Sequence, residues 1–83
     1  MMSETNAPEA QAVLEAPGTS CANLTPQIRE NIMALVSGQV LEVRSDDPAA
    51  REGVPAWSRL TGHRLIATFE DNASDTRFFL ERK

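Results

Sequence analysis

The sequence predicts an α+β fold, a two-layer α/β sandwich of order β-α-β-α-β-β. Two helices are expected to cover one face of a four-stranded mixed sheet. Apolar residues alternate along short segments, as in strands with one buried face, and recur at helical spacing along two others. A strand, a helix and a strand in succession favour a parallel pair with a right-handed crossover. The last two strands are joined by a short polar turn and favour an antiparallel hairpin.

The first strand and the first helix are expected in the first half of the chain. The strand is predicted at Ala12–Ala16, a short segment rich in alanine. The helix is predicted from about Pro26 to Ser37, because Thr25 suits a capping position and proline suits the first helical position. Its apolar stripe consists of Ile28, Ile32, Leu35 and Val36. Gly38 is expected to end this helix in the left-handed conformation.

A second helix is expected after Asp47 and Pro48, with Asp47 as its cap and Pro48 at its first position. Because Gly53 weakens a helix and Pro55 has no backbone donor, we expect an interruption. The two expected pieces are 48–52 and about 55–61. The side chains expected to face inward are Val54, Trp57 and Leu60. Gly62 is expected to end the second piece.

Three further strands complete the predicted sheet. They are expected at Gln39–Arg44, His63–Glu70 and Thr76 to about Arg82. Strict alternation would turn a set of apolar residues toward the helices, namely Leu41, Val43, Leu65, Phe69, Phe78 and Leu80. The same alternation would place Val40, Ile66 and Phe79 on the open face of the sheet. Three apolar residues gathered there would form a candidate docking patch for a partner protein.

Length and composition limit the class of protein. The 83 residues suit a single domain, which we expect over residues 12–83. Residues 1–11 are polar and are expected to form a disordered tail. The net charge is −4 and the basic residues are scattered among acidic ones, which argues against nucleic acid as the main partner. The sequence shows no membrane-spanning run and no signal-peptide pattern.

The single cysteine, Cys21, is the strongest candidate for chemistry. One cysteine cannot form an internal disulfide, so a reducing cytoplasm is expected. Cys21 follows a glycine-containing turn and precedes the first predicted helix. The positive end of a helix dipole favours the thiolate form of a nearby thiol. The alternative interpretation is a small buried apolar residue, since free cysteines are among the most buried residue types.

Other side chains have simpler structural explanations. One cysteine and one histidine are too few for a zinc site, and we expect no metal or organic cofactor. His63 could serve as a base for a thiol, but it begins a strand and is expected to have a structural role. Arg29 is expected to be a solvated helix residue. Trp57 is expected to lie in the core or at an edge that faces a partner.

From Leu14 onward the chain resembles the TusA/SirA/YedF family of small sulfur-carrier proteins. The resemblance is carried by residues 14–21, 38–43, 46–50, 54–57, 61–63 and 77–83. It implies the same sandwich, and it implies that Cys21 takes up sulfur as a persulfide and passes it to a partner. One departure concerns the family's Cys-Pro-x-Pro motif, which is degenerate here because Ala22 and Leu24 replace its prolines.

The function expected from these observations is that of a sulfur carrier, or sulfurtransferase. Cys21 would accept sulfane sulfur from a cysteine desulfurase or a rhodanese-like donor and hand it to a downstream acceptor protein. The pathway stays open between tRNA thiolation, cofactor assembly and sulfur oxidation. Two alternatives also stay open. One is a non-catalytic interaction module of the same fold, and the other is an RNA-binding regulator, which the acidic balance disfavours.

Overall fold

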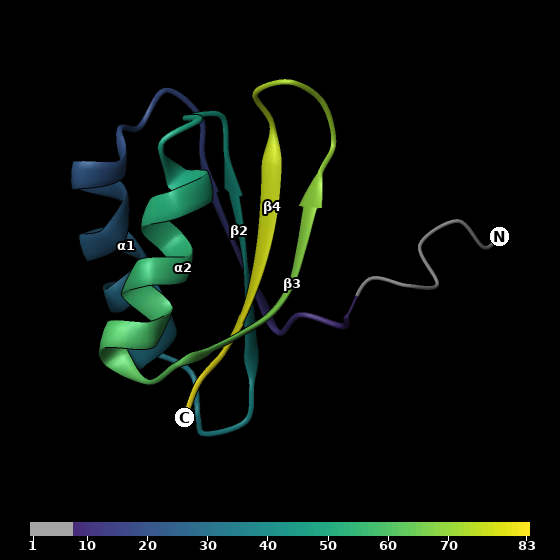
Figure 1. The fold of residues 1–83 in the computed structure, drawn as a ribbon. Coiled ribbons are helices and arrows are strands. Elements are labelled where there is room, and N and C mark those ends of the chain that lie inside the picture. Colours follow the sequence, from purple (N-terminus) through teal and green to yellow (C-terminus); the bar gives the residue numbers. More distant parts are fainter. Residues whose placement is uncertain (1–7) are drawn as a thin grey trace, which may run out of the picture.

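Two helices lie against one face of a four-stranded sheet (Figure 1). The computed structural model describes residues 8–83, apart from the side chain of Cys21. The elements are β1 (Ala12–Ala16), α1 (Cys21–Met33), β2 (Val40–Ser45), α2 (Ala50–Thr61), β3 (Arg64–Glu70) and β4 (Thr76–Glu81). The predicted fold class and the predicted order of elements are confirmed.

The sheet has the strand order β1-β2-β4-β3. β1 runs parallel to β2, with Leu14 opposite Val43, and β4 runs antiparallel to both of its neighbours. The predicted parallel pair and the predicted hairpin are therefore both confirmed. Each helix returns the chain between parallel strands, so α1 and α2 begin near the carboxyl ends of β1 and β2 and run back along the sheet, antiparallel to these strands (Figure 1).

Part of the predicted tail pairs with the sheet. The amide of Gln11 donates to the carbonyl of Val40 over 2.9 Å, and the Val40 amide donates to Oε1 of Gln11 over 2.8 Å. These bonds continue the β1–β2 pairing by one residue. Most of the segment predicted to be disordered, residues 1–7, lies outside the described residues.

The core lies between the sheet and the helices. From the sheet it takes Leu41, Val43, Phe78 and Leu80, all fully buried. From the helices it takes Leu24, Ile28, Ile32, Ala50 and Val54, also fully buried. Burial of one such large aliphatic or aromatic side chain contributes about 1.5–3 kcal/mol. This shared core fixes the positions of both helix ends relative to the sheet.

The predicted start and end of α1 are wrong. The helix begins at Cys21 and ends at Met33, so Pro26 lies inside it rather than at its first position. The buried stripe starts one turn earlier than predicted, because Leu24 is fully buried beneath the first turn. Packing of this leucine outweighs the backbone hydrogen bond that Pro26 cannot donate. At the other end, Val36 is 63% exposed and adds no packing that would prolong the helix.

The predicted interruption of α2 is also wrong. Backbone bonding runs through the glycine, since the Gly53 amide donates to the Ala49 carbonyl over 3.0 Å. Asp47 was predicted to cap this helix, but the capping residue is Ala49. The Asp47 side chain instead holds the turn before the helix, where its Oδ1 accepts from the Ala49 amide over 3.0 Å. Val54 faces inward as predicted, but Leu60 is 85% exposed. Gly62 ends the helix with φ 87°, as predicted.

An irregularity in β3 changes which side chains reach the open face of the sheet. Leu65 pairs with Leu80 but Ala67 pairs with Phe79, so Ile66 is an extra residue in this strand. A β-bulge of this kind reverses the alternation beyond it. Phe69 therefore packs edge-on against Phe79 at 5.7 Å between ring centroids, rather than toward the helices as predicted.

Candidate functional site at the amino end of α1

Cys21 is the first residue of α1, and Ser20 is the residue that caps the helix. Ser20 is extended, with φ −69° and ψ 157°, and its carbonyl accepts from the amides of Asn23 and Leu24 over 3.0 and 2.8 Å. The Ser20 side chain makes no capping hydrogen bond, and the first turn contains no acidic residue. The positive end of the helix dipole is therefore not offset by a carboxylate of its own first turn.

The turn that leads into Cys21 is held by an aspartate from another loop. The Gly18 amide donates to both carboxylate oxygens of Asp46, over 2.9 and 3.1 Å. Gly18 adopts φ 72°, a left-handed conformation that glycine reaches without steric cost. The contact ties the β1–α1 turn to the β2–α2 turn across 28 residues of sequence. Sequence reasoning assigned no such role to Asp46.

A surface hollow of about 290 Å³ opens beside the start of α1. Its lining residues are Gly18, Thr19, Ser20, Asp46 and Asp47. The backbone of Cys21 directly follows this lining, so the helix start lies at a concave surface. The positive end of the helix dipole favours an anion at this helix start, whereas the carboxylate of Asp46, which holds the adjoining turn, disfavours one nearby.

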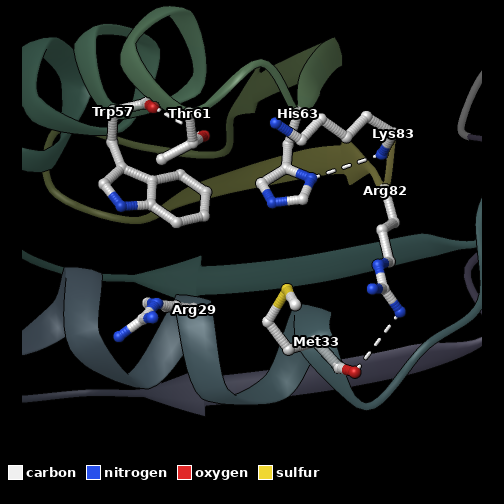
Figure 2. A pocket seen from close by; sticks show the side chains of 7 residues that line it. All are labelled: Arg29, Met33, Trp57, Thr61, His63, Arg82 and Lys83. Atoms are coloured by element: carbon white, nitrogen blue, oxygen red, sulfur yellow. Dashed lines mark hydrogen bonds between the residues drawn. The ribbon is translucent and has the colours of Figure 1, made fainter.

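His63 belongs to the opposite end of the helix pair. Its Nδ1 accepts from the Lys83 amide over 3.3 Å, and its ring stacks on Trp57 at 5.6 Å between centroids. Its side chain lies beside Met33, the last residue of α1, whereas Cys21 is the first (Figure 2). Burial, with the nearby charges of Lys83 and Arg82, lowers the pKa of His63. The structural role predicted for His63 agrees with this position.

The remaining predicted residues divide between two regions. Arg29 and Trp57 line a second hollow with His63, at the far end of the helices from Ser20.

Val40 and Phe79 are only 8% and 1% exposed, and Ile66 is half-buried. The open-face docking patch was predicted to be exposed, and that exposure is not found for Val40 or Phe79. Whether Val40, Ile66 and Phe79 contact a partner protein stays a prediction.

Within residues 8–83, excluding the Cys21 side chain, no three His, Cys, Asp or Glu side chains gather closely enough to bind a metal ion. Neither α1 nor α2, the helices of the described part, has the length and apolar character that a membrane crossing needs.

The fold defines a small α/β sandwich protein whose single cysteine is the first residue of α1. A family model described as sulfurtransferase TusA matches residues 12–82, and the chain belongs to this family. YrkI of Bacillus subtilis (strain 168) is 30% identical over 74 residues, which cover 89% of this chain and 97% of YrkI. The sulfur carrier protein TusA of Pseudomonas putida (strain GB-1) is 32% identical over 60 residues, which cover 72% of this chain and 75% of that relative.

Proposed function

We propose that this protein is a sulfur carrier that holds sulfane sulfur as a persulfide on Cys21 and passes it to a partner protein. Family membership supports a sulfur-carrier role. The single observation that carries the proposal is the position of Cys21 as the first residue of α1. Ala22 and Leu24 replace the family's motif prolines, yet the helix still begins at the cysteine. The altered motif therefore leaves the backbone position of the cysteine at the helix start.

The transfer step needs a thiolate that a donor can reach. The Cys21 thiolate attacks the outer sulfur of a donor persulfide, a new S–S bond forms, and the donor's S–S bond breaks. The donor leaves as a thiolate, and Cys21 then carries one additional sulfur. The sulfur keeps its oxidation state, so no external oxidant or reductant takes part. The amino end of α1 favours the anion that makes this attack.

Release of the sulfur requires another molecule. The chain contains one cysteine, so no second thiol can displace the sulfur through an internal disulfide. A thiolate on an acceptor protein attacks the outer sulfur of the Cys21 persulfide and takes it, and Cys21 leaves as a thiolate. We therefore propose two protein partners, a cysteine desulfurase or rhodanese-like donor and a downstream acceptor.

Sulfur loading provides the test. The protein is incubated with a cysteine desulfurase and cysteine, and its intact mass is measured without reductant. We expect a mass gain of one sulfur, lost after treatment with a thiol reductant. In Cys21→Ser the gain should disappear while the circular dichroism spectrum stays unchanged. A persistent mass gain in Cys21→Ser would reject the assignment of Cys21.

A relocated thiol gives the matched control. The double variant Cys21→Ser, Ser37→Cys keeps one thiol but places it in the exposed loop between α1 and β2. We expect it to load at least about tenfold more slowly than the native chain, since it lacks the helix start and the concave surface beside it. Equal loading of the two proteins would show that any exposed thiol suffices, which would favour a module without a built transfer site.

A further inference from the structure

A hollow of about 350 Å³ lies where α1 and α2 end, away from Cys21. Figure 2 shows its lining side chains coming from both helices, from His63 just before β3, and from Arg82 and Lys83 after β4. The lining residues are Arg29, Met33, Trp57, Thr61, His63, Arg82 and Lys83. A volume of this size falls within the range of small-molecule sites.

The charge of this hollow is opposite to that of the chain. The protein carries a net charge of −4, but the lining contains three cationic side chains and no Asp or Glu side chain. Arg29 makes no hydrogen bond or ion pair with any residue in the part of the chain that the structure describes. Arg82 donates to the carbonyls of Met33 and Leu35, so its charge is fixed at the rim. The hollow therefore presents a concentrated positive field with one uncommitted guanidinium.

The rest of the lining is planar or apolar. The rings of Trp57 and His63 stack with an interplanar angle of 22°, and Met33 is 51% exposed beneath them (Figure 2). The Lys83 amide donates to Nδ1 of His63, so the ring hydrogen of the neutral imidazole lies on Nε2. That hydrogen is a directed donor on the side of the hollow that faces Met33. Aromatic faces with adjacent donors suit a flat ligand with an acidic group.

We propose that this hollow binds a small aromatic anion, with its ring against Trp57 and Met33 and its acidic group on the guanidinium of Arg29. The guanidinium of Arg29 supplies charge-assisted hydrogen bonds to this acidic group. A second, more open hollow of about 630 Å³ shares Arg29 and Met33 and leaves room for a larger substituent. Glu30 lines the second hollow but not the first.

The proposed site is separate from the sulfur site. Arg29 follows Cys21 by eight residues in one helix, which places it about 12 Å further along the helix axis. Met33 lies about 18 Å along the same axis from Cys21. A ligand in this hollow therefore lies away from the start of α1, and its binding is measured on protein without added sulfur.

The test uses benzoate and its neutral counterpart benzamide. The chain has one tryptophan, so the indole Nε1–H of Trp57 gives a single reporter signal in a ¹H–¹⁵N correlation spectrum. We expect benzoate to shift this signal saturably with a dissociation constant on the order of millimolar, as a ligand of so few atoms allows. Benzamide should bind at least about fivefold more weakly, because it lacks the charge. Absence of saturable benzoate binding, or equal binding of benzamide, would overturn the proposal.

A pair of charge-matched variants locates the binding. Arg29→Gln removes the uncommitted guanidinium, and Arg59→Gln removes the same charge from an exposed residue of α2 that lines neither hollow. We expect Arg29→Gln to weaken benzoate binding about fivefold and Arg59→Gln to change it by less than about twofold. Equal weakening in both variants would reduce the effect to general attraction by the surface charge and would overturn the assigned site.

Discussion

The two ends of α1 have different chemical environments. At the amino end, Ser20 caps the helix through its backbone alone, and the adjoining turn is held by Asp46. At the carboxyl end, the carbonyls of Met33 and Leu35 are bonded by Arg82, next to His63 and Trp57. The first end presents backbone amides at Cys21, the residue that carries the single thiol. The second presents Arg82, which is held by two carbonyls, and the uncommitted Arg29 beside aromatic rings. One helix thus separates the proposed sulfur site from the proposed anion site.

The largest expected effect comes from removing the side chain that fixes the amino end. Leu24 is fully buried beneath the first turn of α1. We expect Leu24→Ala to lower the free energy of unfolding by about 2–5 kcal/mol, as for other large-to-small core substitutions. Urea unfolding measures this change. A loss below about 1 kcal/mol would show that the first turn of α1 does not depend on this packing.

The turn before Cys21 gives the next largest effect. Gly18 has φ 72° and open space where a Cβ would lie, so Gly18→Ala introduces conformational strain without a clash. We expect a loss of about 1–2 kcal/mol in the free energy of unfolding. Gly38→Ala, at φ 88° and also in open space, is the matched control for the strain alone. Slower sulfur loading in Gly18→Ala but not in Gly38→Ala would assign the turn a role in presenting the thiol.

Removal of one charge near the amino end should change the thiol itself. Asp46→Asn keeps an oxygen that accepts from the Gly18 amide but removes the negative charge. We expect the pKa of the Cys21 thiol to fall and alkylation at neutral pH to become faster by up to about fivefold, which corresponds to about 1 kcal/mol. Asp75→Asn, in the exposed β3–β4 turn, removes an equal charge elsewhere. Equal rate increases in the two variants would show that the charge of Asp46 has no specific effect on the pKa of the Cys21 thiol.

The smallest expected effect belongs to the carboxyl end and depends on pH. Burial and two cations lower the pKa of His63 in the folded protein below its unfolded value near 6.5. Between these two pKa values the unfolded chain binds more protons, so the folding stability falls as the pH falls through this window. Above pH 6.5 this contribution is constant. We expect His63→Gln to flatten the stability profile between pH 7 and 5, measured by urea unfolding at each pH. An unchanged slope would contradict the burial of a neutral imidazole.

The sheet was predictable because its signals are local. Alternation around Leu41 and Val43 and the polar turn at residues 71–75 identify strands and a hairpin without knowledge of distant contacts. The β-bulge at Ile66 has no comparable local signal, since Ile66 and Ala67 continue an ordinary strand pattern. The side chains beyond it were therefore assigned to the wrong face.

Helix boundaries were harder to predict because prolines gave a misleading local signal. Pro26 and Pro48 both resemble first helical residues, yet Pro26 lies inside α1 and Pro48 lies before α2. Burial of Leu24 and Ala50 against the sheet decides both starts, and this packing is tertiary. The cysteine was predictable as a lone thiol near a helix start. The cationic hollow was not, although the adjacent Arg82 and Lys83 were a partial signal.

The pH dependence of Cys21 alkylation tests the central claim most directly. The rate is measured by mass from pH 5 to 10 for the native chain and for the variant whose only thiol is Ser37→Cys in a Cys21→Ser background. The account predicts that Cys21 titrates below the ordinary thiol value of about 8.5, whereas the relocated thiol titrates near it. Identical profiles for the two thiols, or a Cys21 pKa above that value, would contradict the claim that the helix start primes this cysteine.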